Sequence, residues 1–265
     1  MSLRKYPYYL SSIGRLLTGI EQPGYTTRLF LGLAGPGPHS IRLRKRGLRF
    51  LARGPNDVWA LKETFLDGFY ERFGFRIEAG WNILDIGGGI GDFAIFAATA
   101  APGTRVAAYE PTRESLALMQ ENLALNGLAQ VLTYHEAVWS QAGELAIAAS
   151  PVEPGRNRSK RPEDEGNQVT VRSVPLAEAI ARLGPDGCQL LKVDCEGAEF
   201  DIFLETQSTV LDRVERIVME YHDGVADQDH PALVAHFRAC GFVVETFPNY
   251  VHDDIGYLRA WRDPG

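Results

Sequence analysis

The chain has 265 residues, of which 45% are hydrophobic, and it carries 34 acidic against 27 basic side chains. This length and composition suit one elaborated α/β domain, and the longest apolar run near its core, 93–101, is too short to cross a bilayer. Ser11, Ser12, Gly14 and Arg15 interrupt the apolar core that a signal peptide requires, so we expect none, and the three cysteines form no C-x-x-C zinc motif. We therefore expect a soluble, cytoplasmic protein with reduced thiols.

The N-terminal segment is basic, with ten Lys and Arg against one Glu among residues 1–53. Apolar and basic residues alternate over 41–50 around Gly47, which predicts a half-buried β-hairpin. Its basic face is either an ordinary solvated surface or a means of attracting an anionic substrate. Because no aromatic side chains interleave with the basic run, nucleic acid is not an expected partner.

A second helical segment is predicted to begin at Pro55, with Asp57 as its N-cap and an apolar face that includes Val58 and Phe65. With an accessory helix and loop over 1–40 and the basic hairpin, it makes up an N-terminal extension, residues 1–80. We expect this extension to form part of a substrate pocket. Residues 81–265 then form the catalytic domain.

A glycine-rich loop follows a buried strand at 82–86 and precedes an alanine-rich helix. Glycines permit a tight turn and a close approach of a ligand to the backbone, and the helix start favours an anion. The loop fits Asp-x-Gly-x-Gly-x-Gly, the first motif of S-adenosylmethionine-dependent methyltransferases, at Asp85, Gly87, Gly89 and Gly91. In that motif the acid can meet the ammonium of the methionine moiety. In another frame Gly89–Ala94 fits the dinucleotide pattern G-x-G-x-x-A, so an NAD(P)-dependent oxidoreductase is the alternative.

Strand-like and helix-like segments alternate from residue 82 onward, which predicts a mostly parallel sheet. The last two strands have no helix between them and must be antiparallel. The seven expected strands are 82–86, 105–109, 130–134, 189–193, 214–219, 242–247 and 256–261. Such a Rossmann-like, seven-stranded α/β sheet with an antiparallel C-terminal hairpin is typical of class I methyltransferases. Two further short strands, 144–149 and 168–173, flank a polar segment at 151–167 that we expect to be a mobile lid or a surface loop.

Acidic residues close successive strands of this predicted sheet, at the edge where open α/β sheets bind ligands. Glu110 could accept both ribose hydroxyls of an adenosine, or alternatively cap the helix that begins near Thr112. Glu136 could accept the adenine amine with Ala137 against the ring, or be an ordinary loop acid.

A second acid-rich segment, Asp194-Cys195-Glu196-Gly197-Ala198-Glu199, follows the fourth strand. Three acids in six residues repel one another in an apolar core, so they face a polar cleft, a metal or solvent. Glu220 and His222 close the fifth strand at the same edge. Cys195 is interpreted as a small strand-end residue rather than a nucleophile.

Four motifs together resemble the FkbM-type methyltransferases: LDIGGGIG (84–91), YEP (109–111), LKVDCEGAE (191–199) and MEYH (219–222). The resemblance covers roughly residues 40–262, with Gly88 standing where alanine is usual. It implies that residues 81–265 bind S-adenosylmethionine and that the enzyme O-methylates a hydroxyl of a small molecule, such as a secondary metabolite, sugar or glycolipid. Transfer is then an in-line displacement governed by positioning. A non-catalytic S-adenosylmethionine-binding protein is a further alternative.

An alcohol acceptor must lose a proton, and Asp194 is the first candidate for its acceptor, followed by His222 and Glu196. Alternatively, His222 bonds a backbone carbonyl and Glu196 caps the next helix. Asp194, Glu220 and His222 could also hold Mg²⁺ that acidifies the hydroxyl. We do not favour the metal from the sequence, because no compact binding loop accompanies these residues.

Overall fold

A seven-stranded sheet forms the centre of the computed structural model, which describes residues 5–35, 37–148, 168–249 and 252–263. The strand order is β11-β12-β10-β9-β3-β4-β5, with β10 to β5 parallel and β12 antiparallel to both its neighbours. The predicted sheet with its antiparallel C-terminal hairpin is therefore confirmed. Its strands are β3 (Asn82–Ile86), β4 (Arg105–Tyr109), β5 (Leu132–Tyr134), β9 (Leu190–Val193), β10 (Arg216–His222), β11 (Val243–Pro248) and β12 (Ile255–Trp261).

Side chains alternate between the two faces of this sheet, as a period of two residues requires. Along β3, Ile83 belongs to one hydrophobic cluster and Leu84 to the other, and Val106 and Ala107 divide in the same way along β4. Helices α5 (Asp92–Ala100) and α6 (Arg113–Leu125) cover the first face. The second face is covered by α7 (Leu176–Ala181), α8 (Glu199–Leu204), α9 (Ser208–Leu211) and α10 (His230–Ala239). The sheet is thus buried on both sides.

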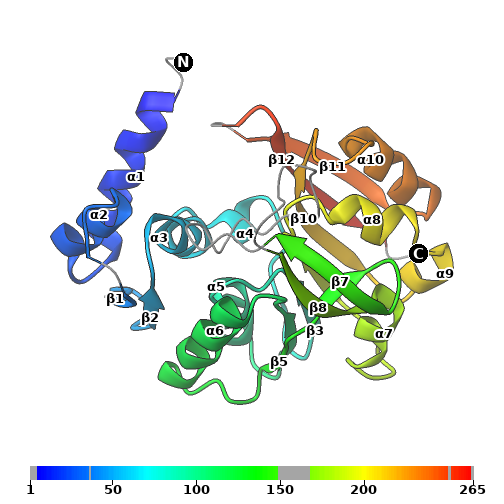
Figure 1. Cartoon of the computed structure of the whole chain (residues 1–265), viewed down its shortest axis with the longest axis horizontal. Helices are drawn as coiled ribbons and strands as arrows, with labels where there is room; N and C mark the ends of the chain where they lie inside the picture. The colour runs from blue at the N-terminus through cyan, green and yellow to red at the C-terminus, as the bar shows by residue number, and fades with distance from the viewer. Residues whose placement is uncertain (1–4, 36, 149–167, 250–251, 264–265) are drawn as a thin grey trace.

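The N-terminal extension lies at one end of the molecule, with α1 and α2 farthest from the sheet and α3 nearer to it (Figure 1). Its buried residues Leu16, Phe50 and Val58 belong to the same hydrophobic cluster as Ile83 of β3. The extension therefore shares a core with one face of the sheet. It comprises α1 (Lys5–Gly19), α2 (Pro23–Phe30), β1 (His39–Arg42), β2 (Arg49–Ala52), α3 (Pro55–Leu61), the π-helical turn η1 (Lys62–Leu66) and α4 (Phe69–Arg72).

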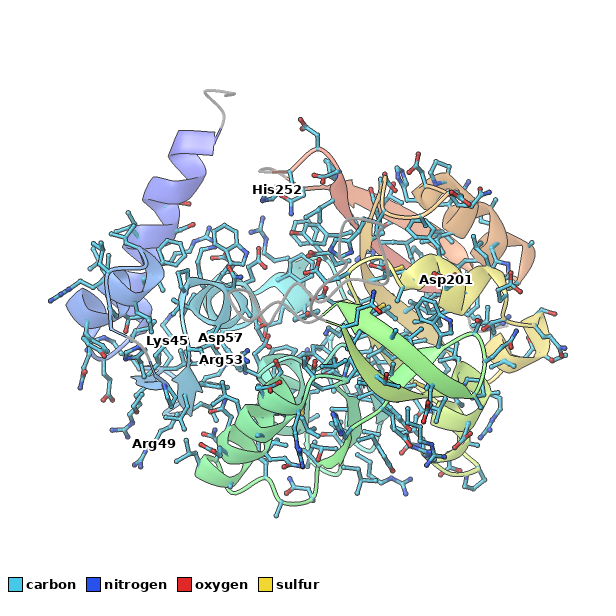
Figure 2. The ribbon with its side chains drawn as sticks, in the orientation of Figure 1. Lys45, Arg49, Arg53, Asp57, Asp201 and His252 are labelled. Carbon is cyan, nitrogen blue, oxygen red and sulfur yellow. The ribbon has the colours of Figure 1, made fainter. Side chains whose placement is uncertain are left out.

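Strands β1 and β2 form the predicted basic hairpin, on which Lys45 and Arg49 are exposed. Arg49 extends away from the body of the molecule in Figure 2. The prediction that Asp57 caps α3 is wrong, because Gly54 is the N-cap. The Asp57 carboxylate lies inside the first turn and accepts the backbone N–H of Arg53 at 2.7 Å. It also pairs with the Arg53 guanidinium at 2.9 Å.

A second, three-stranded sheet of order β6-β8-β7 lies beside the main sheet. It consists of β6 (Ala137–Trp139), β7 (Gly143–Ala148) and β8 (Gln168–Pro175), so both strands predicted around the polar segment are present. The loop expected at 151–167 lies outside the described residues. Within the described ranges, no helix has the length and apolar character that a bilayer crossing requires.

Two asparagines, Asn122 of α6 and Asn126 at its C-cap, attach the extension to the sheet domain. The Asn122 side chain accepts the backbone N–H of Leu51 at 2.6 Å and donates to the carbonyls of Leu51 and Ile90. Asn126, one turn later, makes the same pair of bonds to the backbone of Arg49. The amides thus take the place of a neighbouring strand along the edge of β2, which satisfies backbone groups that a sheet edge leaves open.

We expect Asn122→Ala to lower the free energy of unfolding by roughly 2–4 kcal/mol, because it leaves three part-buried or buried backbone groups without their partner. The matched control is Asn126→Ala, where water can reach the same kind of backbone groups, and its effect is expected below about 1 kcal/mol. Urea denaturation with an unchanged m-value measures both. Equal losses in the two variants would contradict this account of the docking.

Candidate active site

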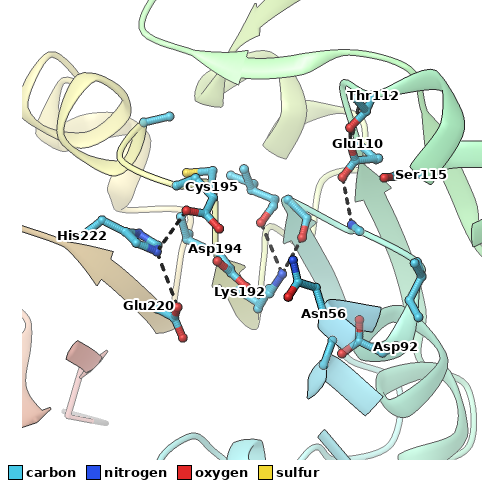
Figure 3. Close-up of a pocket in the computed structure, with 18 of the residues that line it drawn as sticks. Asn56, Asp92, Glu110, Thr112, Ser115, Lys192, Asp194, Cys195, Glu220 and His222 are labelled. Atoms are coloured by element: carbon cyan, nitrogen blue, oxygen red, sulfur yellow. Dashed lines mark hydrogen bonds and ion pairs between the residues drawn. The ribbon is translucent and has the colours of Figure 1, made fainter. Parts of the chain in front are cut away.

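A cavity of about 860 Å³ opens at the carboxyl ends of the parallel strands, within the size range of small-molecule sites. Its lining combines the glycine loop, the strand-end acids, the β6 region and helices α3 to α4 of the extension. Glu110, Thr112 and Ser115 lie at one side and His222, Glu220 and Asp194 at the other, with Lys192 between them (Figure 3). The strand-end acids Glu110, Glu136, Asp194 and Glu220 are therefore gathered along one cavity.

The packing around three glycines of the loop explains why they lack a side chain, which the sequence did not reveal. A Cβ on Gly87 would lie 1.7 Å from the Asp194 carbonyl oxygen, and its φ is +77°. A Cβ on Gly91 would lie 2.7 Å from Met119, and its φ is +84°. A Cβ on Gly88 would lie 2.5 Å from the flexible end of Met119. Gly91 is not among the cavity-lining residues, and the contact with Met119 gives it a packing role.

Gly89 faces open space and belongs to the cavity lining, and its N–H donates to Glu110 Oε2 at 2.9 Å. Glu110 Oε1 accepts the backbone N–H of Thr112 at 2.8 Å and the Thr112 hydroxyl. Thr112 is the N-cap of α6, so Glu110 does support this helix start across Pro111 while it also lines the cavity. Burial raises the pKa of Glu110. A carboxylate offers about four acceptor positions, so these three bonds leave capacity for a ligand hydroxyl.

Asp85 does not line the cavity, contrary to the expectation that it faces a ligand. Its carboxylate is fully buried, and Oδ1 lies 3.0 Å from Nζ of Lys192, its register partner on β9. The contact is an ion pair without an aligned hydrogen bond. Lys192 donates instead to the Gly87 carbonyl at 2.7 Å and reaches the cavity lining. Burial opposes the charge on Lys192, but Asp85 and Asp194 outweigh it and raise its pKa.

Glu136 lies at the cavity edge with its carboxylate already paired. It contacts the guanidinium of Arg182 and, at 3.3 Å, that of Arg172. An adenine amine would have to share this carboxylate with two arginines, which the sequence analysis did not foresee. Ala137 is buried and lines the cavity beside it.

Asp194, Glu220 and His222 come together as predicted, each offering a ligand atom within 4.8 Å of the other two. His222 is buried, and its Nδ1 lies 2.6 Å from Glu199 Oε1. The partner of His222 is therefore a carboxylate and not the backbone carbonyl that the sequence offered as an alternative. The Nε2 atom lies 3.5 Å from Glu220 Oε1 and 3.7 Å from Glu196 Oε2. Although burial acts in the other direction, the neighbouring carboxylates of Glu199 and Glu220 raise the pKa of His222 to about 12.

Glu196 has a φ of +54°, unlike every other non-glycine residue in the described part of the chain. A left-handed backbone at such a residue costs about 1–3 kcal/mol, so the surrounding loop holds it in place. The expectation that Glu196 caps the next helix is wrong, because the N-cap of α8 is Ala198, with no side-chain cap bond. Glu196 instead lines the cavity. Burial, together with Glu199 and Asp194, raises the pKa of Cys195, which keeps the thiol protonated and supports its interpretation as a structural residue.

Residues 85–244 match the sequence profile of the methyltransferase FkbM domain. The chain belongs to the FkbM methyltransferase family. It is 26% identical over 234 residues to the 31-O-demethyl-FK506 methyltransferase FkbM of Streptomyces tacrolimicus, a match that covers 77% of this chain and 89% of that relative. It is 27% identical over 216 residues to Methyltransferase 1 of Beauveria bassiana, covering 73% and 84%. Methyl transfer is thus the reaction class, and the oxidoreductase interpretation of the glycine loop is set aside.

Solved structures agree with this family at the level of the fold. The methyltransferase FkbM from Methylobacillus flagellatus KT superposes with a TM-score of 0.51 at 13% identity, covering 76% of this chain and 48% of that chain. The chain therefore spans about half the length of that protein. A SAM-dependent methyltransferase from Agrobacterium tumefaciens gives a TM-score of 0.50 at 13% identity, covering 87% and 72%.

Several residues in and around the cavity of this FkbM-family protein were not predicted from the sequence. Lys192 could have been found, because a lysine inside a predicted buried strand requires a negative partner, and Asp85 stands inside another. Glu199 belonged to a motif already noted, but nothing local indicated that it would contact His222. Glu63 and Thr64 come from η1, and their place in the cavity depends on how the extension packs.

We expect Lys192→Met to destabilise the fold by about 3–5 kcal/mol, because it leaves the buried Asp85 carboxylate without its counter-charge. In the double variant Lys192→Met/Asp85→Asn, the second change should recover part of that loss. A double-mutant cycle measured by chemical denaturation gives the coupling energy of the pair. Additive effects of the two changes would show that the ion pair does not hold the strands.

Proposed function

We propose that this FkbM-family methyltransferase uses S-adenosylmethionine to O-methylate a hydroxyl of a small molecule. The observation that carries the proposal is the distribution of groups along one cavity. Glu110 and the glycine loop lie at one side, and Asp194, Glu220 and His222 at the other. A donor and an acceptor bound at the two sides would meet near Lys192 and Asp194.

The first side suits the adenosine of the donor. Glu110 keeps acceptor capacity for ribose hydroxyls after its bonds to Thr112 and Gly89. Gly89 leaves open space where a side chain would stand, so a ligand can approach the backbone. Ala137 offers a small apolar surface for the adenine, while Glu136 would reach its amine only in competition with Arg182. In this arrangement Asp85 acts through Lys192 and Gly87 rather than by contact.

The second side suits deprotonation of an alcohol. In the transfer step the acceptor oxygen forms a bond to the methyl carbon, the carbon–sulfur bond breaks, and its electron pair stays on sulfur. The hydroxyl proton passes to a nearby base, for which Asp194 is our first candidate and Glu196 a further one. His222 lies between Glu199 and Glu220, which raise its pKa, and it is the weaker candidate. Positioning of the two reactants supplies the rest of the rate enhancement.

The extension, residues 1–80, would provide the acceptor wall of the catalytic domain, residues 81–265. Trp59, Phe69 and Tyr70 line the cavity with apolar rings, and Asn56 and Glu63 add polar groups among them. This wall suits an acceptor with an apolar body and a hydroxyl, such as a secondary metabolite or a glycolipid. The name of the Streptomyces tacrolimicus relative, a 31-O-demethyl-FK506 methyltransferase, supports O-methylation of such a compound.

The direct test is transfer of labelled methyl from S-adenosylmethionine to a panel of hydroxylated metabolites and glycolipids, with products mapped by mass spectrometry. We expect at least one product methylated on oxygen. Methylation only on nitrogen or carbon would contradict the proposed acceptor class. Binding of the donor without transfer to any member of a broad panel would favour the non-catalytic alternative.

We expect Glu110→Gln to weaken S-adenosylhomocysteine binding by about 10–100-fold, since a hydrogen bond to a charged group contributes about 1.5–3 kcal/mol. Glu114→Gln, an exposed change on the same helix as Thr112, is the matched control and should bind normally. Isothermal titration calorimetry measures both. Unchanged affinity in Glu110→Gln would show that this residue does not bind the donor.

We expect Asp194→Asn to lower kcat by about 10²–10⁴-fold, the usual contribution of a general base, while S-adenosylhomocysteine affinity stays within a few-fold of the parent. Asp227→Asn, at an exposed position beyond β10, is the control and should retain full turnover. Initial rates with the acceptor identified in the screen test this. A full rate in Asp194→Asn would show that another group accepts the hydroxyl proton.

A further inference from the structure

We propose that Asp194, Glu220 and His222 form a binding site for a divalent cation of the Mg²⁺ or Mn²⁺ kind, with Glu199 as the residue that positions His222. The three come from the ends of neighbouring parallel strands, β9 and β10, and each presents one ligand atom within 4.8 Å of the others. Atoms bound to one such cation lie no farther apart than about 4–4.5 Å, twice the metal–ligand distance. The three ligand atoms therefore have to approach one another by at most a few tenths of an ångström to bind one cation.

The imidazole of His222 is aimed into this group by a partner outside it. Its side chain is 4% exposed, and Nδ1 is fixed by Glu199 Oε1 at 2.6 Å. Nε2 therefore points toward Glu220 and Glu196, whose nearest oxygens lie at 3.5 and 3.7 Å, beyond the usual hydrogen-bond length. A carboxylate on one ring nitrogen, leaving the other free to ligate, is the arrangement found behind metal-bound histidines. A metal ion would take the place of the second ring proton.

The negative charges around the three residues also favour the binding of a cation. Glu63 lines the same cavity as Asp194 and Glu220, so three carboxylates share one partly closed space. The neighbouring ammonium, that of Lys192, already contacts Asp85 and the Gly87 carbonyl. Carboxylates that face one another in a partly closed cavity repel unless a positive charge lies between them.

What the cation would do there rests on the proposed function. Asp194, Glu220 and His222 all line the cavity, so a coordination position of the cation would face the acceptor. A cation of this kind lowers the pKa of a hydroxyl that coordinates it and orients that oxygen. Asp194 has a second carboxylate oxygen on the cavity side of the group, so a proton acceptor remains available.

The test uses Mn²⁺ alone with the metal-free full chain, without donor or acceptor. Electron paramagnetic resonance should show one bound Mn²⁺ per chain, and electron spin-echo modulation should show the nitrogen of one imidazole. Asp194→Asn and Glu220→Gln should each weaken binding by at least tenfold. Glu199→Gln should weaken it by about 10–100-fold, the usual effect of losing a partner behind a ligand, while the imidazole signal persists at saturating Mn²⁺.

Glu110→Gln, an acid on the other side of the same cavity, is the control and should bind Mn²⁺ like the parent. Thermal melting of each variant shows whether it is folded. No Mn²⁺ bound by the parent protein, or no nitrogen modulation, would overturn the proposal even if a variant fails to fold. Methyl transfer without Mn²⁺ binding refutes the cation site alone, whereas Mn²⁺ binding without any transfer refutes the proposed function alone.

Discussion

The ion pair between Lys192 and Asp85 is the contact on which the site depends. It joins β9 to β3 in the middle of the sheet, at positions that the strand register places side by side. In a low-dielectric interior such a pair is tolerated only when both charges are present and further polar groups satisfy them. The Gly87 carbonyl supplies one of these groups, so the same lysine fixes the glycine loop relative to the acid-rich segment. The absence of a Cβ on Gly87 allows the Asp194 carbonyl to approach, which completes the junction.

From this junction the rest of the site follows by topology. The carboxyl ends of parallel strands meet at one edge, so Glu110, Asp194 and Glu220 face a common space although they are far apart in sequence. The extension supplies the other wall because its apolar residues share a core with α5 and β3. Asn122 and Asn126 then fix the hairpin to α6 by hydrogen bonds. The cavity is thus a product of both parts of the chain.

The sequence was sufficient to predict the features of the fold that depend on local pattern. Strands β3 and β4 have their predicted bounds, and the hairpins and the antiparallel C-terminal pair follow from the pattern of apolar residues and turns. The fifth strand was predicted to end at Met219 but continues to His222, because β12 pairs with it as far as Ile255. The gathering of Asp194, Glu220 and His222 was also predictable, since it requires only that their strands be parallel neighbours.

What the sequence could not supply were the partners of individual charged side chains. Asp85 pairs with Lys192, Glu136 with Arg182 and His222 with Glu199, and each partner comes from a different element of the fold. Such pairs depend on packing and register rather than on local pattern, so a motif identifies the acid but not its partner.

A crystal structure of the protein with S-adenosylhomocysteine tests the central claim most directly. Our account predicts the ribose beside Glu110 and the sulfur directed toward Asp194, with Lys192 still paired to Asp85. A ligand bound away from the carboxyl ends of β3 and β4, or one whose sulfur faces away from Asp194, would contradict it.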